Sequence, residues 1–168
     1  MKMLKQQKFN RKNISGFTLI ELAVTLAIVG VLLFYAIPSY NDFSKRQAIS
    51  NEANDILGDL GYARSLAIEN GNVVTVTSVS GVNWSNGWNI SQTLADGSTE
   101  LSRTKIVVPN NVIMAGTSGV ITYNSIGNLS SAPLSINLGI TPEYPNFLSI
   151  RVLASGMASS TRDAYENE

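Results

Sequence analysis

The apolar stretch over residues 17–40 constrains this chain more than any other feature of its sequence. It reads FTLIELAVTLAIVGVLLFYAIPSY, and its only charged side chain is Glu21. About 20 apolar residues in a helix cross the hydrocarbon core of a bilayer, because each residue adds about 1.5 Å. Cations precede the stretch without any acid, which favours one membrane-spanning helix with its N-terminus in the cytoplasm. These cations are Lys2, Lys5, Lys8, Arg11 and Lys12.

A cleavable secretory signal is the alternative interpretation of a basic segment followed by an apolar one. The apolar region of such a signal spans about 7–15 residues and ends in a small-x-small cleavage site. Here the apolar run is longer, and the sequence AIPSYN at residues 36–41 matches that site poorly. We therefore favour a retained membrane helix.

Glu21 is the unusual residue of this stretch, because a carboxylate inside a membrane helix is costly unless it reaches the interface or finds a partner. Two interpretations remain open from the residues alone. The side chain reaches the lipid headgroups, or it forms an ion pair. A new N-terminus created just before Phe17 would place an ammonium group about one helical turn away, within reach of an ion pair.

Beyond Pro38 the sequence predicts an amphipathic continuation of the helix over residues 41–71. Apolar residues recur at helical spacing, and Asn70-Gly71 is typical of a helix C-terminus. One helix is thus expected from about residue 18 to residue 70, half of it in the bilayer and half on a globular domain. Gly58 and Gly61 lie inside it, and we interpret them as sites where the helix packs closely against a sheet rather than as a functional hinge.

Over residues 72–168 the apolar pattern changes to a period of two, which predicts β-structure. Strands are expected at 73–79, from 84 to 90, and at 100–108, 112–114, 120–123, 134–138 and 147–153. The expected fold class is α+β, with a long N-terminal helix packed on antiparallel sheets. We interpret Trp84 and Trp88 as aromatic anchors of the core, with a ligand-stacking platform as the alternative.

The composition excludes several classes of enzyme. The chain has no His and no Cys, so Ser-His-Asp hydrolases, cysteine proteases and zinc enzymes are ruled out. No carboxylates are spaced for acid/base catalysis or for a metal, and Asp96-Gly97 is better explained by a hairpin turn than by a calcium loop. We therefore expect no catalytic residues, no metal and no cofactor.

The segment SGFTLIEL at residues 15–22 resembles the processing signature of type IV pilins and type II secretion pseudopilins. The resemblance implies that residues 1–16 are a leader, cleaved after Gly16 by a prepilin peptidase. It also implies that Phe17 is then N-methylated and that Glu21 pairs with the N-terminus of a neighbouring subunit. Pro38 falls where this family has a helix-kinking proline, consistent with its lost N–H and ring clash.

The globular part is similar to the GspH/FimT class of minor pseudopilins and minor pilins. The likeness rests on YARSLAI at residues 62–68, the strand at 73–77 and the pair Trp84 and Trp88. It implies a subunit that helps initiate a secretion pseudopilus or a type IV pilus. It further implies a single-pass protein of the bacterial inner membrane with a periplasmic β domain, and a place at the filament tip. The implied partners are other pilins or pseudopilins, the assembly platform and, before assembly, lipid.

Two features depart from the family pattern. Many members join strands by Cys pairs, whereas this chain has none. Some FimT-like pilins bind DNA through a C-terminal Gly-Arg-x-Arg motif, whereas here Met157 follows Gly156. The arginines left as possible ligand contacts are Arg151 and Arg162. DNA reception is thus the alternative function, and the side-chain charge of −5 on residues 17–168 makes it the weaker one.

Overall fold

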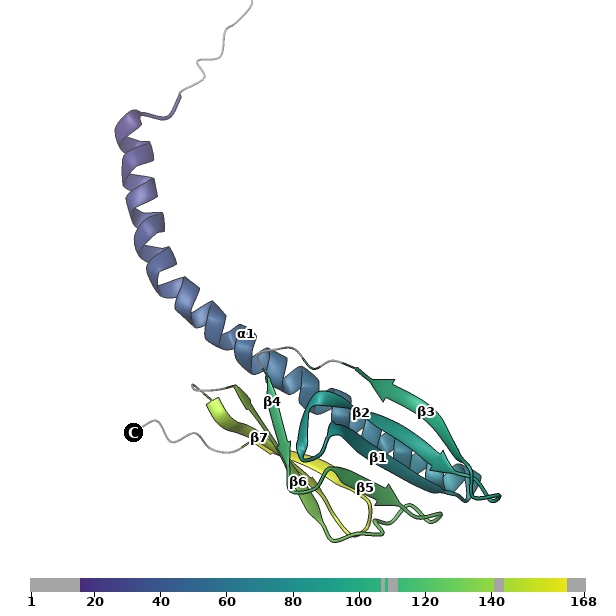
Figure 1. The fold of residues 1–168 in the computed structure, drawn as a ribbon. Helices are drawn as coiled ribbons and strands as arrows, with labels where there is room; N and C mark the ends of the chain where they lie inside the picture. Colours follow the sequence, from purple (N-terminus) through teal and green to yellow (C-terminus); the bar gives the residue numbers. More distant parts are fainter. Residues whose placement is uncertain (1–15, 107, 109–111, 141–143, 163–168) are drawn as a thin grey trace, which may run out of the picture. The chain divides into compact units, whose positions relative to one another are not determined.

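A computed structural model of the chain describes residues 16–106, 108, 112–140 and 144–162. The described residues fall into two compact units that divide between Tyr40 and Asn41. One helix, α1 (Leu19–Asn70), contributes to both units, as predicted (Figure 1). By length and composition its apolar part is able to cross a membrane.

The ends of α1 follow from local chemistry. The backbone N–H of Glu21 donates to Thr18 Oγ1 at 3.3 Å, and the N–H of Leu22 donates to the Thr18 carbonyl oxygen at 3.1 Å. Thr18 is therefore the N-cap, with Glu21 three residues later in a T-x-x-E capping-box sequence. At the other end Gly71 has φ of 65°, a left-handed conformation that stops a helix at little cost.

The second half of α1 buries one stripe of side chains, and the spacing of three and four residues explains why a sheet can cover it. Its members are Ile49, Glu52, Ala53, Ile56, Asp59, Leu60, Ala63 and Ala67. Gly58 and Gly61 do not belong to this stripe. Both are exposed, and a Cβ at either position would meet nothing within 4 Å. The interpretation of these glycines as close-packing sites is therefore wrong.

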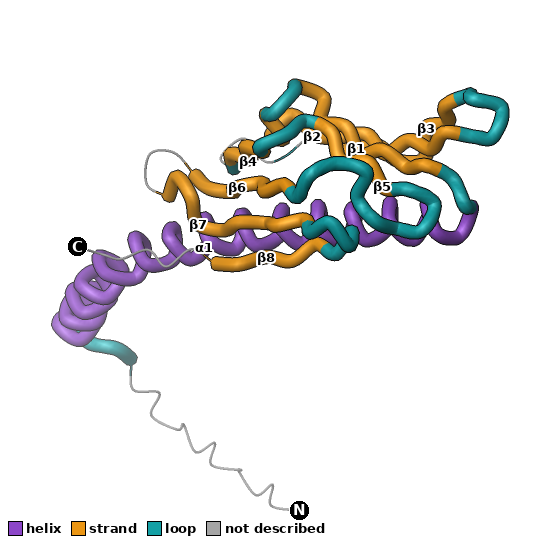
Figure 2. The backbone as a smooth tube through the Cα atoms, turned by 90° about the horizontal axis from the view of Figure 1, so that it is seen from below, coloured by secondary structure: helices purple, strands orange, loops and turns teal. Residues whose placement is uncertain are grey.

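The strands form one eight-stranded antiparallel sheet, and residues 41–70 of α1 run along one face of it (Figure 2). The order is β5-β1-β2-β4-β6-β7-β8, with β3 paired to β2. The strands are β1 (Val73–Ser80), β2 (Asn83–Thr93), β3 (Thr99–Lys105), β4 (Ile113–Gly116), β5 (Val120–Tyr123), β6 (Leu134–Ile140), β7 (Tyr144–Val152) and β8 (Ala158–Arg162). The α+β fold with a long helix on antiparallel strands is confirmed.

Seven of these strands correspond to predicted ones, with shifts at their ends. The predicted third strand extends to residue 108, whereas β3 ends at Lys105. The eighth strand, β8, was not predicted. Four of its five residues are exposed at the edge of the sheet. A strand in this position needs no apolar alternation, and the sequence ASSTR has none.

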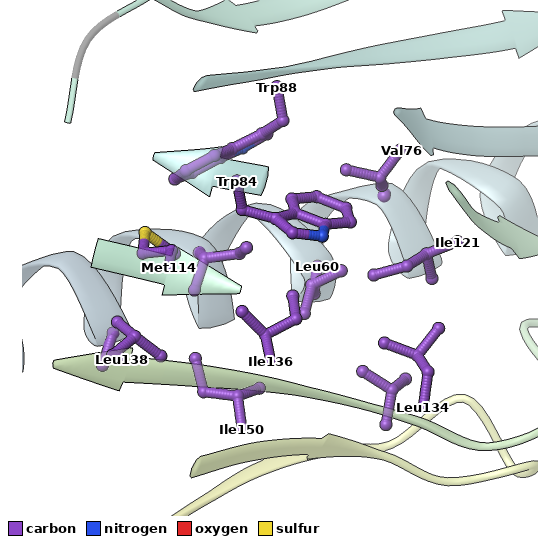
Figure 3. Close-up of a cluster of buried hydrophobic side chains, with 14 of the residues drawn as sticks. Leu60, Val76, Trp84, Trp88, Met114, Ile121, Leu134, Ile136, Leu138 and Ile150 are labelled. Carbon is purple, nitrogen blue, oxygen red and sulfur yellow. The ribbon is translucent and has the colours of Figure 1, made fainter. Parts of the chain in front are cut away.

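The core lies between α1 and the sheet and contains both indoles (Figure 3). Trp84 and Trp88 are fully buried, and their ring centroids lie 6.4 Å apart. Trp84 lies among side chains of α1, β4, β5 and β6, including Leu60, Met114 and Ile121. The two halves of the sheet are joined at β2 and β4 by one residue pair, Asn83 with Ala115, and Trp84 packs beside this joint.

Candidate assembly site

The expected processing site lies at the start of the described chain. Gly16 and Phe17 are both exposed, and a Cβ at Gly16 would meet nothing within 4 Å. Glu21 is exposed in the first turn of α1. The Thr18 cap fixes the backbone from Thr18 to Glu21, a role that sequence reasoning missed although the T-x-x-E spacing indicates it.

The apolar half of α1 presents its side chains outward. Every residue of α1 up to Asp42 is exposed, large apolar residues included, so this surface has no cover within the described chain. Ala27, Ile28, Val31 and Leu32 line a shallow, entirely apolar groove of about 300 Å³. A surface of this kind needs lipid or other apolar helices around it. Pro38 lies inside the helix.

A group of polar side chains links α1 to the sheet. Asp59 accepts a hydrogen bond from Trp88 Nε1 at 2.8 Å. It also forms an ion pair with Arg103. Asp55 and Glu52 precede Asp59 on the helix by one and two turns. Lys105 Nζ of β3 lies 2.6 Å from Asp55 Oδ2 and 3.5 Å from Glu52 Oε2. Sequence reasoning missed this group, although two acids on an otherwise apolar helix stripe are a visible signal.

Burial affects the charges of this group. Glu52 is buried, and the loss of solvation raises the pKa of its carboxyl although the charge of Lys105 opposes the change. Burial acts to lower the pKa of Lys105, but its hydrogen bond to Asp55 and the charge of Glu52 raise it above the usual value. Among the described residues Glu52 Oε2 accepts no hydrogen bond. These contacts hold the helix on the sheet.

The two tryptophans have structural hydrogen bonds in addition to their packing. Trp84 Nε1 donates to the Ser118 carbonyl oxygen at 2.9 Å, and Trp88 Nε1 donates to Asp59. Because both side chains are fully buried, neither ring offers an open face on which a ligand could stack.

The residues considered for DNA contact are not brought together. Arg162 of β8 pairs with Leu148 of β7, and its guanidinium lies 5.2 Å from the centre of the Phe147 ring. Arg151 lies three residues from Leu148 on β7 and therefore points to the opposite face. Gly156 has φ of 78°, and a Cβ there would lie 1.9 Å from the Gly127 carbonyl oxygen, so a tight turn explains this glycine. The acids 163, 166 and 168 lie outside the described residues.

A long helix, apolar in its first half and packed on an antiparallel sheet in its second, defines a pilin-like protein. The model of the family "Type II transport protein GspH" matches residues 52–156, and the chain belongs to this family. The prokaryotic N-terminal methylation motif matches residues 11–37. The resemblance to the GspH/FimT class is confirmed. The motif and the apolar helix are features of a single-pass, membrane-anchored pilin-like protein.

Curated relatives include fimbrial proteins. A fimbrial protein of Pseudomonas aeruginosa is 32% identical over 96 residues, which cover 57% of this chain and 60% of that protein. The type IV major fimbrial protein FimA of Dichelobacter nodosus is 54% identical over 35 residues, covering 21% of this chain and 22% of FimA. The chain thus spans three fifths or less of the length of these relatives.

Solved structures of two minor subunits share the fold. The type IV minor pilin FimU of Pseudomonas aeruginosa superposes with a TM-score of 0.57 at 18% identity, covering 72% of this chain and 92% of FimU. The minor pseudopilin EpsH of the Vibrio cholerae type II secretion system gives a TM-score of 0.56 at 10% identity, covering 72% and 98%. At such low sequence identities, these comparisons show a shared fold and nothing beyond the fold.

Proposed function

We propose that the chain is a minor pilin or pseudopilin that helps initiate a filament, either a type II secretion pseudopilus or a type IV pilus. The observation that carries this proposal is the continuity of α1. The helix begins in the methylation motif and ends packed in the GspH-family unit. FimU and EpsH resemble the chain almost equally, so the proposal covers both kinds of filament.

Before assembly, the first half of α1 spans the bacterial inner membrane, with the N-terminus in the cytoplasm and the β domain in the periplasm. Lipid then covers its exposed apolar side chains. A prepilin peptidase cleaves after Gly16, and Phe17 becomes the methylated N-terminus. The exposure of both residues suits access by an enzyme.

On assembly, the helix exchanges lipid for the helices of other pilins or pseudopilins, and an inner-membrane platform drives the step. The apolar faces over residues 22–37 form the filament core, and Glu21 neutralises the N-terminal ammonium of a neighbour. An ion pair removed from water needs both partners, since one unpaired charge is far more costly than a neutral pair. The subunit lies near the filament tip, and its role is structural rather than enzymatic.

The Glu21→Ala variant tests the proposal. We expect normal insertion in the membrane and normal cleavage, but loss of filament or secretion output. The matched control is Glu69→Ala, which removes an exposed acid at the other end of the same helix and should leave output unchanged. Normal output from Glu21→Ala would overturn the role of Glu21.

Processing has its own test. The Gly16→Leu variant should remain at the unprocessed, heavier mass, whereas the wild-type chain should begin at a methylated Phe17 by mass spectrometry. An intact Met1 terminus in the wild-type chain would contradict the proposal and indicate an anchored domain unrelated to filaments. No observation on the described residues specifically favours DNA reception.

A further inference from the structure

Arg151 lies on an interior strand, in the middle of a row of hydroxyl side chains. On β7 it pairs with Ser135 of β6 on one side and with Ser159 of β8 on the other. Directly paired residues of an antiparallel sheet point to the same face, with Cβ atoms about 5 Å apart. The neighbours Ile150 and Val152 are fully buried in the core, so Arg151, Ser135 and Ser159 point away from α1.

The polar groups of this row have no partners within the described part of the chain. The Arg151 guanidinium makes no hydrogen bond, ion pair or ring contact there, and the hydroxyls of Ser135 and Ser159 make no hydrogen bond. Other arginines differ. Arg103 pairs with Asp59, Arg64 donates to the Gly127 carbonyl oxygen, and Arg162 packs on Phe147. The row therefore presents the N–H donors of one guanidinium and two hydroxyl groups, all of them available to a ligand.

A groove of about 370 Å³ opens beside the guanidinium. Its lining contains no acidic residue and combines polar with apolar side chains; it consists of Thr117, Pro133, Leu134, Ser135, Arg151, Val152 and Leu153. Pro133 and Leu153 are exposed, so they offer apolar surface to the methylene groups of an incoming side chain. The place suits a short side chain with an apolar stem and an anionic end.

We propose that this groove binds the carboxylate of an Asp or Glu side chain on a neighbouring filament subunit. A guanidinium holds a carboxylate through two parallel N–H···O bonds, and the hydroxyl of Ser135, which also lines the groove, can donate to the same oxygens. A nucleic acid fits less well, because each bound phosphate calls for its own cation. Among the described residues this face has one arginine, and the side chains after residue 16 carry a net charge of −5. The identity of the partner as a subunit rests on the proposed function.

The test uses the full-length chain in detergent-solubilised membranes, with each pilin-like subunit of the same cell as a probe. The Arg151→Glu variant should lose co-purification with at least one subunit by about tenfold or more. Reversal of one Asp or Glu to Arg in that subunit should restore it. Arg151→Lys should retain more of the subunit than Arg151→Gln, because it keeps the charge but not the fork. Arg103→Gln is the control, since its partner Asp59 lies within the chain.

The outcomes separate this proposal from the function on which it rests. Retention of every subunit by Arg151→Glu would overturn the carboxylate site alone, and so would a loss that no charge reversal restores. A wild-type chain that retains no subunit would count against the proposed function as well. Salt-sensitive binding of a labelled 30-base-pair DNA that disappears in Arg151→Gln would assign the groove to phosphate instead.

Discussion

Trp88 and Asp59 join the sheet to the helix through a buried hydrogen bond of 2.8 Å from the indole Nε1 to Oδ2 of the carboxylate. The other carboxylate oxygen of Asp59 forms an ion pair with Arg103 of β3. Arg103 in turn packs over the Tyr62 ring at 4.7 Å. One carboxylate on α1 therefore satisfies donors from two strands, and β3 is held on the helix although most of its side chains are exposed.

Replacing Asp59 with Ala should cost about 2–4 kcal/mol of folding stability, because it leaves a buried indole N–H and a guanidinium without partners. Asp59→Asn should cost less, since its amide oxygen can still accept from Trp88. The measurement is urea denaturation of the purified full-length chain in detergent, followed by tryptophan fluorescence. Both tryptophans of the chain lie in this core, so the signal reports on its loss. An Asp59→Ala variant as stable as Glu69→Ala would contradict the assignment.

Gly156 offers a prediction that separates backbone strain from steric overlap. Gly156 and Gly97 have similar φ angles of 78° and 82°, but a Cβ at Gly156 would overlap the Gly127 carbonyl oxygen, whereas at Gly97 it would meet nothing within 4 Å. Gly97→Ala should therefore cost about 1 kcal/mol from strain alone. Gly156→Ala should cost more than about 2 kcal/mol, because it also displaces a turn to which Arg64 donates. The same denaturation assay compares the two variants, and equal losses would refute the distinction.

The elements that the sequence predicts well are those whose side chains alternate between solvent and core. The helix ends where Gly71 permits it, and β1 shows the period of two at Val74 and Val76. β8 escaped prediction because it is an edge strand held by backbone pairing to β7, which its sequence does not show. β3 was overextended because Ile106 continues its apolar pattern, although this side chain is exposed.

Candidate sites made of residues close together in the sequence could be predicted, whereas those assembled from distant segments could not. Gly16, Phe17 and Glu21 are close together in the sequence, so their relationship could be inferred without a structure. The joining of Asp59 to Trp88 and Arg103, and the row around Arg151, depend on strand register between segments distant in the chain. Nothing in a single sequence fixes that register. The interpretation of Gly58 and Gly61 went wrong for a related reason, because a missing side chain does not say which face of the helix is covered.

Tyr123 predicts a loss of stability at alkaline pH. Its side chain is fully buried, its hydroxyl has no hydrogen-bond partner among the described residues, and burial raises its pKa from 10.0 to about 12. Between these values the unfolded chain releases the proton while the folded chain keeps it, so stability falls as the pH rises from 10 to about 12.

The Tyr123→Phe variant should remove this contribution. At neutral pH it should be neutral or more stable by up to about 1 kcal/mol, because an unpaired buried hydroxyl is lost. From pH 10 to about 12 it should lose less stability than the wild-type chain. The check is denaturation at several pH values, with Tyr62→Phe, which leaves Tyr123 intact, as control. A variant with the same alkaline slope as the wild-type chain would refute the role of Tyr123.

Gly58 and Gly61 are exposed positions inside α1, where alanine should stabilise the fold. Because a Cβ at either position meets nothing within 4 Å, alanine adds no clash and restricts the unfolded chain. Gly58→Ala and Gly61→Ala should each stabilise the fold by about 0.5–1 kcal/mol. Gly71→Ala is the matched control, since the same change on a residue with φ of 65° should destabilise the end of the same helix. Loss of stability in Gly58→Ala or Gly61→Ala would show that the sheet covers this face after all.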